Sequence, residues 1–151
     1  MTYTTFRPQS SQLSSSLWIE PWQDNITEQT GHDPRSLYVE QYWLSVIGPT
    51  ATWFMRYVAH EFDRYPNGFE LSVPEISLQL GVSPKCGNRS GLHRTLERLV
   101  VFRLAAQGHA GFAVRRQLPH LNNAQIRRLP QHLKRSHSKH APAYNKEIQN
   151  V

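Results

Sequence analysis

The sequence predicts an α+β domain that is mostly helical, and three patterns support this fold class. Apolar and aromatic residues recur at helical spacing in two segments of the first half, residues 37–47 and 50–65. Residues 69–73 alternate apolar and polar side chains, as a short strand does. Two glycines, Gly108 and Gly111, separate two further alternating segments, which favours a hairpin. A chain of 151 residues is long enough for one such domain with tails.

The first two helices are expected to supply much of the core, because their apolar stripes are rich in aromatic rings. Ser36 is the candidate N-cap of the first helix. Gly48 suits the left-handed position at its C-terminal end, and Pro49 suits the first turn of the second helix. The second helix is expected to end near Tyr65, before a Pro-Asn-Gly turn.

Two shorter helices are expected after the strand at 69–73. The first begins at the proline that follows the strand and ends at the Gly-Val-Ser turn, residues 81–83. Residues 84–90 then read as a loop, and Asn88 or Ser90 is the candidate N-cap of the second helix. That helix is expected to run to about Phe102, with Leu92, Leu96, Leu99 and Val100 facing inward.

The last part of the domain is predicted to be a hairpin followed by a C-terminal helix. Strands are expected over 103–107 and 112–118. Asn122 or Asn123 is the expected cap of the last helix, which Pro130 breaks or bends. We therefore divide the chain into a flexible N-terminal arm over 1–35, a folded domain over 36–119, and a C-terminal helix with a basic tail over 120–151. Within the arm, the apolar cluster Leu17–Trp22 is expected to dock on the domain, since two exposed tryptophans are a liability.

Charge is distributed unevenly along the chain. Four basic and nine acidic side chains lie in residues 1–75, and thirteen and two in residues 76–151, so formal charges of −5 and +11 make up the net +6. A polyanion is expected to approach the basic half. The alternative for this half is a solvated basic tail.

Composition narrows the class of protein. Hydrophobic residues make up 38% and charged residues 19%, which is typical of a globular chain. Cys86 is the single cysteine, which excludes an internal disulfide and fits a reducing compartment. Neither a secretory signal nor an apolar run of bilayer length is recognisable. We expect a cytoplasmic, nucleoid-associated protein without membrane contact.

One constellation resembles a known fold. Residues 74–83 (PEISLQLGVS), then 92–100 (LHRTLERLV), then the glycine turn at 108–111 resemble a winged helix-turn-helix. The resemblance implies a recognition helix over about 89–102 in the major groove and a wing over 103–118 on the backbone. It implies a double-stranded DNA-binding protein, either a transcriptional regulator or a nucleoid-type factor.

Two further features qualify this resemblance. Residues 84–89 enlarge the turn before the recognition helix, which leaves the register of that helix open. Residues 37–50, with the motifs YWL and IGPT, are similar to uncharacterised small actinobacterial winged-helix proteins, and this implies a family but no activity.

We expect DNA contact because arginines lie on the outward face of the predicted recognition helix. Arginine bonds bidentately to guanine, and a helix N-terminus favours phosphate. The alternative for this face is a solvated helix surface. In the wing, adjacent strand residues point to opposite faces, so only one of Arg115 and Arg116 is expected to face DNA. The expected DNA-binding residues are Lys85, Asn88, Arg89, Ser90, His93, Arg94, Arg98, His109, Arg115 and Arg116.

Other function classes find less support in the sequence. Phosphate-loop and dinucleotide glycine patterns are not recognisable, so we expect neither an enzyme nor a cofactor. His132, His137 and His140 lie close in sequence, but a cationic region without nearby carboxylates is a poor metal site, and we expect no metal. Cys86 beside Lys85 is read as an inert loop cysteine, with a redox-sensitive thiol as the alternative.

The main alternative function is a protein–protein interaction module built on a winged helix, because a fold does not fix a function. A protein-binding helix would more often present apolar residues where this one presents arginines. A homodimer is also expected, since paired DNA half-sites are common. The helices around Trp43 and Trp53, or the C-terminal helix, are the candidate dimer surfaces.

Overall fold

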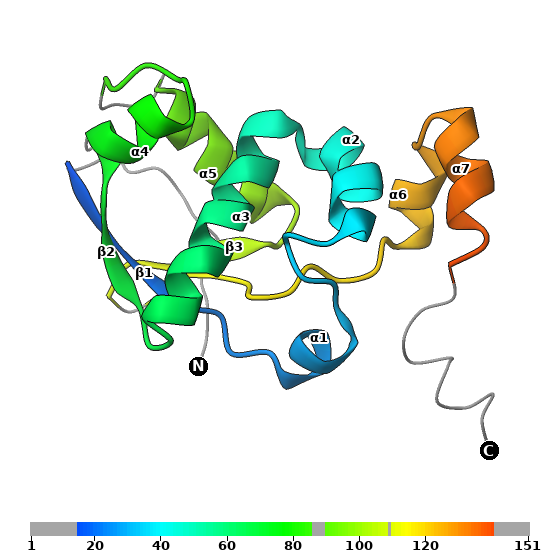
Figure 1. Cartoon of the computed structure of the whole chain (residues 1–151), viewed down its shortest axis with the longest axis horizontal. Helices are drawn as coiled ribbons and strands as arrows, with labels where there is room; N and C mark the ends of the chain where they lie inside the picture. The colour runs from blue at the N-terminus through cyan, green and yellow to red at the C-terminus, as the bar shows by residue number, and fades with distance from the viewer. Residues whose placement is uncertain (1–14, 86–89, 109, 141–151) are drawn as a thin grey trace.

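A four-stranded mixed sheet forms the base of the protein, in a computed structural model that describes residues 15–85, 90–108 and 110–140 (Figure 1). Along the sheet the strands follow the order β2-β1-β4-β3. The first strand pairs antiparallel with β2 and parallel with β4, and β4 pairs antiparallel with β3. About half of the described residues are helical, so the fold is α+β as predicted but less helical than expected. The strands are β1 (Ser16–Pro21), β2 (Phe69–Ser72), β3 (Ala105–Gln107) and β4 (Phe112–Val114).

The strand β1 shows that residues 16–21 of the predicted flexible arm are part of the sheet, and residues 1–14 of that arm lie outside the described residues. It lies in the middle of the sheet, with Leu17 opposite Leu71 and Ile19 opposite both Phe69 and Phe112. Ile19 is completely buried, because alternate residues of a strand face the core. The expected docking of this apolar cluster therefore occurs as strand pairing. The short helix α1 (Asn25–Thr30) follows, capped by the side chain of Asp24.

The aromatic segments form helices close to the predicted bounds. A π-helical turn, η1 (Val39–Trp43), runs into α2 (Leu44–Ile47), and α3 (Pro49–Arg64) follows. Gly48 joins the two helices with a positive φ of 85°, a conformation that side-chain-bearing residues rarely adopt. Trp43 is fully buried, and its indole N–H donates to the carbonyl oxygen of Pro119, so this ring is not available for a dimer surface.

Two helices follow β2, as the sequence predicts. The helix α4 (Val73–Gln79) begins at Ser72, whose hydroxyl accepts from the amide of Glu75. The helix α5 (Gly91–Val101) begins at Ser90, one of the two predicted caps. Eleven residues separate α4 from α5, so the turn between them is as long as the sequence indicates, and its residues 86–89 lie outside the described structure.

The hairpin and the C-terminal segment complete the fold. The hairpin strands β3 and β4 are shorter than predicted and turn through Gly108 and Gly111. Pro130 divides the C-terminal segment into α6 (Asn123–Arg127) and α7 (Gln131–His137), as expected. Asn122 is the cap, and it exchanges hydrogen bonds with Gln125 in a capping box.

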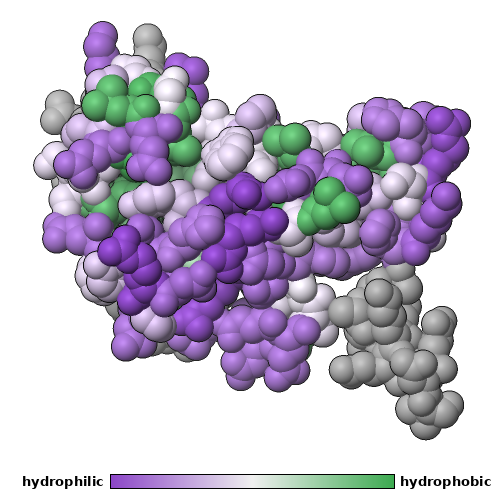
Figure 2. Space-filling view, in the orientation of Figure 1, coloured by the Kyte–Doolittle hydropathy of each residue, from purple (hydrophilic) through white to green (hydrophobic). Residues whose placement is uncertain are grey.

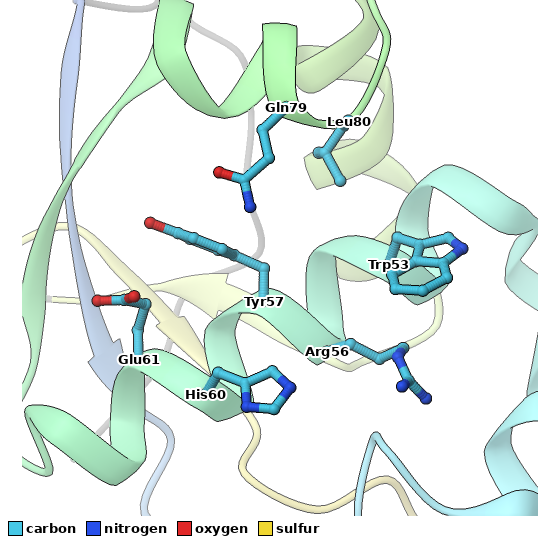
Figure 3. A pocket seen from close by; sticks show the side chains of 7 residues that line it. All are labelled: Trp53, Arg56, Tyr57, His60, Glu61, Gln79 and Leu80. Carbon is cyan, nitrogen blue, oxygen red and sulfur yellow. The ribbon is translucent and has the colours of Figure 1, made fainter.

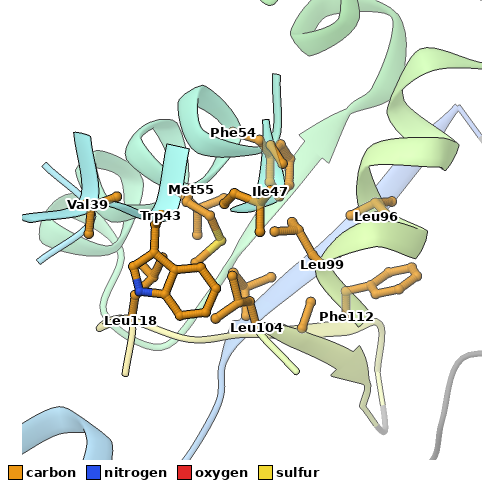
Figure 4. Close-up of a cluster of buried hydrophobic side chains, with 14 of the residues drawn as sticks. Val39, Trp43, Ile47, Phe54, Met55, Leu96, Leu99, Leu104, Phe112 and Leu118 are labelled. Carbon is orange, nitrogen blue, oxygen red and sulfur yellow. The ribbon is translucent and has the colours of Figure 1, made fainter. Parts of the chain in front are cut away.

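The hydrophobic core lies between the helices and the sheet (Figure 4). Trp43 of η1, Leu99 of α5 and Phe112 of β4 come from distant parts of the chain and lie in the same cluster. This shared core fixes the orientation of α5, because its apolar side is packed against the rest of the protein. Its opposite side is therefore set toward the surface.

Candidate nucleic-acid interface

The exposed side of α5 carries the basic residues predicted for DNA contact. Leu92, Leu96 and Leu99 are fully buried, whereas Arg94 and Arg98 are exposed. The two arginines are four residues apart and therefore lie side by side on the helix. Glu97 is the acidic residue of this face, and its carboxylate lies 3.1 Å from Nε2 of His93. The face therefore presents two guanidinium groups and a partly exposed carboxylate that contacts His93.

A hollow of about 490 Å³ lies beside these arginines, between α5 and the start of α3. Arg94 and Arg98 line it from one side, and Gly48, Pro49 and Thr50 from the other. Arg98 donates through Nη1 to the carbonyl oxygen of Ile47, at 3.2 Å. This contact uses one of the five N–H groups of a guanidinium and tethers Arg98 at the rim of the hollow.

Ser90 and His93 were predicted to contact DNA, and the structure places both inside the domain. Ser90 is buried, and its hydroxyl accepts the amide of His93 at the start of α5. His93 is only 3% exposed, on the side of the helix that contains Leu92 and Leu96. Apart from the interaction with Glu97, its ring is packed in the interior, so neither side chain reaches the surface. The apolar stripe in the sequence therefore identified only some of the buried residues of α5, since it did not include His93.

Both arginines of the wing contact other parts of the protein, whereas only one of the two was expected to do so. Arg115 is 13% exposed, donates to Asp24 at 2.6 Å, and lies 4.2 Å above the ring of Trp22. Hydrogen bonding to Arg115 is the main cause that lowers the pKa of Asp24 to about 2. Arg116 donates to the carbonyl oxygen of Pro66 and lies over the ring of Phe62. Both guanidiniums therefore hold elements of the fold together.

The remaining predicted residues divide between the surface and the part of the chain outside the description. Lys85 is exposed at the end of the described turn. Asn88, Arg89 and His109 lie outside the described residues. The sequence argument missed Arg103, which is exposed directly after α5 and has a positive φ of 58°. The signal for Arg103 in the sequence was its position two residues after the apolar C-terminal end of α5.

A second surface lies on the other side of α3, where the helix faces the end of α4 (Figure 3). This groove of about 710 Å³ has Trp53 at one end and Glu61 at the other, with Tyr57 between them. Trp53 is 59% exposed, and the guanidinium of Arg56 lies 4.9 Å from its ring. Burial is the main cause that raises the pKa of Tyr57, followed by the carboxylates of Glu61 and Glu75. The groove combines exposed aromatic surface with charges of both signs.

Apolar exposure continues from this groove onto α4. Leu78 is 65% exposed, and Leu80 lines the groove. Figure 2 shows apolar residues gathered over this part of the molecule, at the upper left, beside a mainly hydrophilic surface. An exposed apolar patch next to polar residues is typical of a protein contact surface.

The described residues contain neither a metal-binding cluster nor a helix that could span a membrane. Within residues 15–85, 90–108 and 110–140, His, Cys, Asp and Glu form no group of three or more with the geometry to hold a metal ion. His132, which the sequence grouped with His137 and His140, is exposed, whereas His137 is buried. In the same part of the chain, the helices are all too short or too polar to cross a bilayer.

Comparisons with known proteins give no match from which a function could be assigned. No family model matches the chain, and neither a curated protein nor a solved structure does.

Proposed function

We propose that this protein binds double-stranded DNA, with α5 as the recognition helix. The observation that carries the proposal is the pair of exposed arginines, Arg94 and Arg98, on a helix whose other side is fixed in the core. An α-helix fits the major groove, where arginine is the commonest reader of guanine. The formal charge of +11 in residues 76–151 would bring a polyanion to this half of the chain.

The order of elements supports a winged-helix reading of this surface. A long helix, a short strand, two helices and a hairpin follow one another as α3, β2, α4, α5 and β3–β4. In that reading the hairpin is the wing and lies on the DNA backbone. Among the described residues, the proposed contacts are Lys85, Arg94 and Arg98, with Arg103 added after the helix. Asn88, Arg89 and His109 lie outside the described residues and stay predicted contacts. Transcriptional regulation is the function we propose for such binding.

The hollow beside α5 gives this surface a place for a backbone phosphate. Arg94 and Arg98 would bind the phosphate oxygens, and Gly48, Pro49 and Thr50 at the start of α3 form the opposite wall. A phosphate seated there would set the position of α5 in the groove. Phosphate contacts orient a protein on DNA, and base contacts select the sequence.

A binding titration tests the proposal directly. Affinity for a pool of genomic duplex fragments is measured at several salt concentrations, for the wild type and for Arg94→Ala. If four to six phosphates are neutralised, the slope of log K against log salt is expected to be about −4 to −5. Arg94→Ala is expected to weaken binding about tenfold, as loss of one base-reading or phosphate-binding arginine does.

Arg64→Ala is the matched control, since Arg64 is an exposed arginine near the far end of α3. It removes the same charge and is expected to change affinity far less than Arg94→Ala. Arg98→Ala needs a parallel measurement of stability, because Arg98 also bonds to Ile47. A salt slope near zero, or equal binding by wild type and Arg94→Ala, would reject α5 as the DNA-binding element.

Protein–protein interaction is the second candidate function, and the groove at Trp53 is the observation that favours it. Self-association through this groove would also give the dimer that paired half-sites require. Sedimentation velocity over a range of concentrations compares the wild type with Trp53→Ala. Dimerisation that Trp53→Ala weakens would support the groove, whereas a wild type that stays monomeric would exclude it as a dimer surface.

A further inference from the structure

Six titratable rings gather where the C-terminal helices pack on the helical segment before α3. Four are histidines and two are tyrosines, and they come from the loop after α1, residues 38–42, the loop before α6, and the end of α7. The ring centres of His32 and Tyr38 are 3.6 Å apart, and those of His120 and His137 are 4.8 Å apart. We call this group the histidine cluster: His32, Tyr38, Tyr42, His120, His137 and His140.

Tyr38 is the centre of the hydrogen bonding in the histidine cluster. Its hydroxyl oxygen accepts the amide N–H of Leu121 at 3.0 Å. It also lies 2.7 Å from Nε2 of His137. A phenol has one proton to donate, and a neutral His137 with Nε2 unprotonated is the acceptor that satisfies it. Protonation of His137 at Nε2 would remove this acceptor for the Tyr38 proton, and it would place a charge on a ring that is only 3% exposed.

The second pair of rings imposes a similar restriction. Nε2 of His32 lies 3.1 Å from Nδ1 of His120. One proton between these two nitrogens makes a hydrogen bond, but two protons place two N–H groups face to face. The pair therefore favours an unprotonated nitrogen on one of its two rings. Tyr42 adds a third link, since its hydroxyl lies 2.6 Å from Oγ of Ser136 in α7.

The groups around His120 and His137 make a positive charge unfavourable. Burial is the first cause that lowers the pKa of His120, to about 4, and the next are the nearby rings of His137 and His140. Burial and then His140 lower the pKa of His137. The rings that face these two histidines from the other elements are His32, Tyr38 and Tyr42. Histidines in contact with other histidines repel one another once they are charged.

These contacts join the C-terminal helices to the rest of the fold. Leu121, whose amide donates to Tyr38, is also buried, so apolar packing adds to the polar contacts. We propose that the histidine cluster is a pH-sensitive latch, which holds α6 and α7 on residues 37–47 at neutral pH and releases them when the solution is acidified. The latch is independent of DNA binding, because it depends only on the contacts between these helices.

The direction of the effect follows from proton linkage. A histidine whose pKa is lower in the docked state than in the free state binds protons more readily after release, so acid favours release. Docking is fully stable above pH 6.5, the ordinary value, and weakens as the pH falls toward about 4. At pH 5 the opening constant is expected to rise about tenfold, after allowance for the partial exposure of His120.

Hydrogen exchange measured by mass spectrometry on the full chain tests the latch. Exchange is compared at pH 7.5 and pH 5.0, with labelling times scaled for the intrinsic effect of pH on amide exchange. Peptides from α6 and α7 are expected to exchange about tenfold faster at pH 5.0. Peptides from α5 are expected to be unchanged, since the core between α3 and α5 does not contain the cluster.

Substitutions identify the rings responsible. The double variant His120→Gln, His137→Gln keeps groups that hydrogen-bond but cannot gain charge, and it is expected to lose the pH dependence. His120→Gln alone, at a half-buried position, is expected to reduce it and guards against failure of the double variant to fold. His132→Gln is the matched control, because His132 is exposed on α7 and outside the cluster.

Three results would overturn the proposal. The first is equal scaled exchange of α6 and α7 at both pH values in the wild type. The second is an equal acceleration of α5, which would mean global unfolding. The third is a double variant with the same pH dependence as the wild type, or, where the double variant does not fold, His120→Gln with that same pH dependence.

Discussion

At the scale of single residues, the structure separates arginines that hold the fold together from arginines that face solvent. Arg115 bridges Asp24, the ring of Trp22 and the carbonyl oxygen of Arg103, so it connects α1, the end of β1 and the start of the hairpin. Arg94 has the same chemistry and an exposed side chain. Residue type alone therefore does not identify the surface that meets a partner.

Asp24→Asn isolates the charge of the Arg115 pair, because asparagine is as good an N-cap for α1 as aspartate. The variant is expected to be about 1–2 kcal/mol less stable at pH 7, since it weakens a partly buried charge-assisted hydrogen bond. The pKa of Asp24 is lowered to about 2, so this stability is present above 3.8 and is lost as the pH falls toward 2. Urea denaturation at pH 7 measures the difference.

Asp63→Asn is the control for that experiment, because Asp63 also bonds an arginine but is 64% exposed. An exposed pair is expected to contribute less than about 0.5 kcal/mol. If the two variants lose the same stability, then burial does not strengthen the Arg115 pair.

The sequence predicted the inward leucines of α5 but not the burial of His93. An apolar stripe identifies positions that must be buried, and it is silent about polar residues at its margin. Ser90 was assigned two roles, a cap and a DNA contact, and the structure supports the first. The contacts of Arg115 and Arg116 with Asp24 and Pro66 join segments far apart in the chain, so no local pattern indicates them.

At the scale of elements, β1 decides the architecture of the sheet. It lies between β2 and β4, so the hairpin strands β3 and β4 connect to β2 only through β1. The segment Leu17–Trp22 is apolar and was expected to dock, but its partners at residues 69–72 and 112–114 lie far along the chain. Pairing over such separations depends on the whole fold, which is why the strand was not predicted from its own six residues.

Ile19→Ala tests the importance of this strand. Ile19 is completely buried and faces Phe69 and Phe112, so its truncation is expected to cost about 2–4 kcal/mol through lost burial and a cavity. Urea denaturation gives the value. Ile26→Ala in α1 is the control, since Ile26 is 76% exposed and its truncation should change stability by less than about 0.5 kcal/mol. Equal effects of the two substitutions would contradict a structural role for β1.

At the scale of the whole molecule, alkaline pH is expected to destabilise the fold through Tyr38. Burial is the main cause that raises its pKa to about 12. A group with a raised pKa stabilises the protein below its ordinary value of 10, and that contribution is lost as the pH rises through 12. The free energy of unfolding is therefore expected to fall by about 1 kcal/mol between pH 9 and pH 11.

Urea denaturation at those two pH values measures this loss in the wild type and in Tyr38→Phe. The variant lacks the hydroxyl, so it should show a smaller loss between pH 9 and 11, although it is less stable at both. Tyr65→Phe is the control, since Tyr65 is exposed. A wild type with unchanged stability over this range, or a Tyr38→Phe variant with the wild-type loss, would contradict the assignment.

The order of elements from α3 to β4 was predictable, because local signals mark each boundary. Gly48 and Pro49 separate two helices, Ser72 and Ser90 begin helices, and the glycine turn marks the hairpin. The histidine cluster was not predictable from spacing, since His32 and His120 meet only when the two ends of the fold come together. Local sequence signals determine where each element begins and ends, whereas long-range packing determines which elements lie next to one another.

The position of β1 also has a consequence for synthesis of the protein. Residues 16–21 leave the ribosome before their partner strand β4, which is complete only when residue 114 has been made. Until then one edge of β1 has no partner, and its apolar side chains depend on β2 and the growing helices for cover. The sheet can close only after β4 has been made, and pairing of such distant strands is slow.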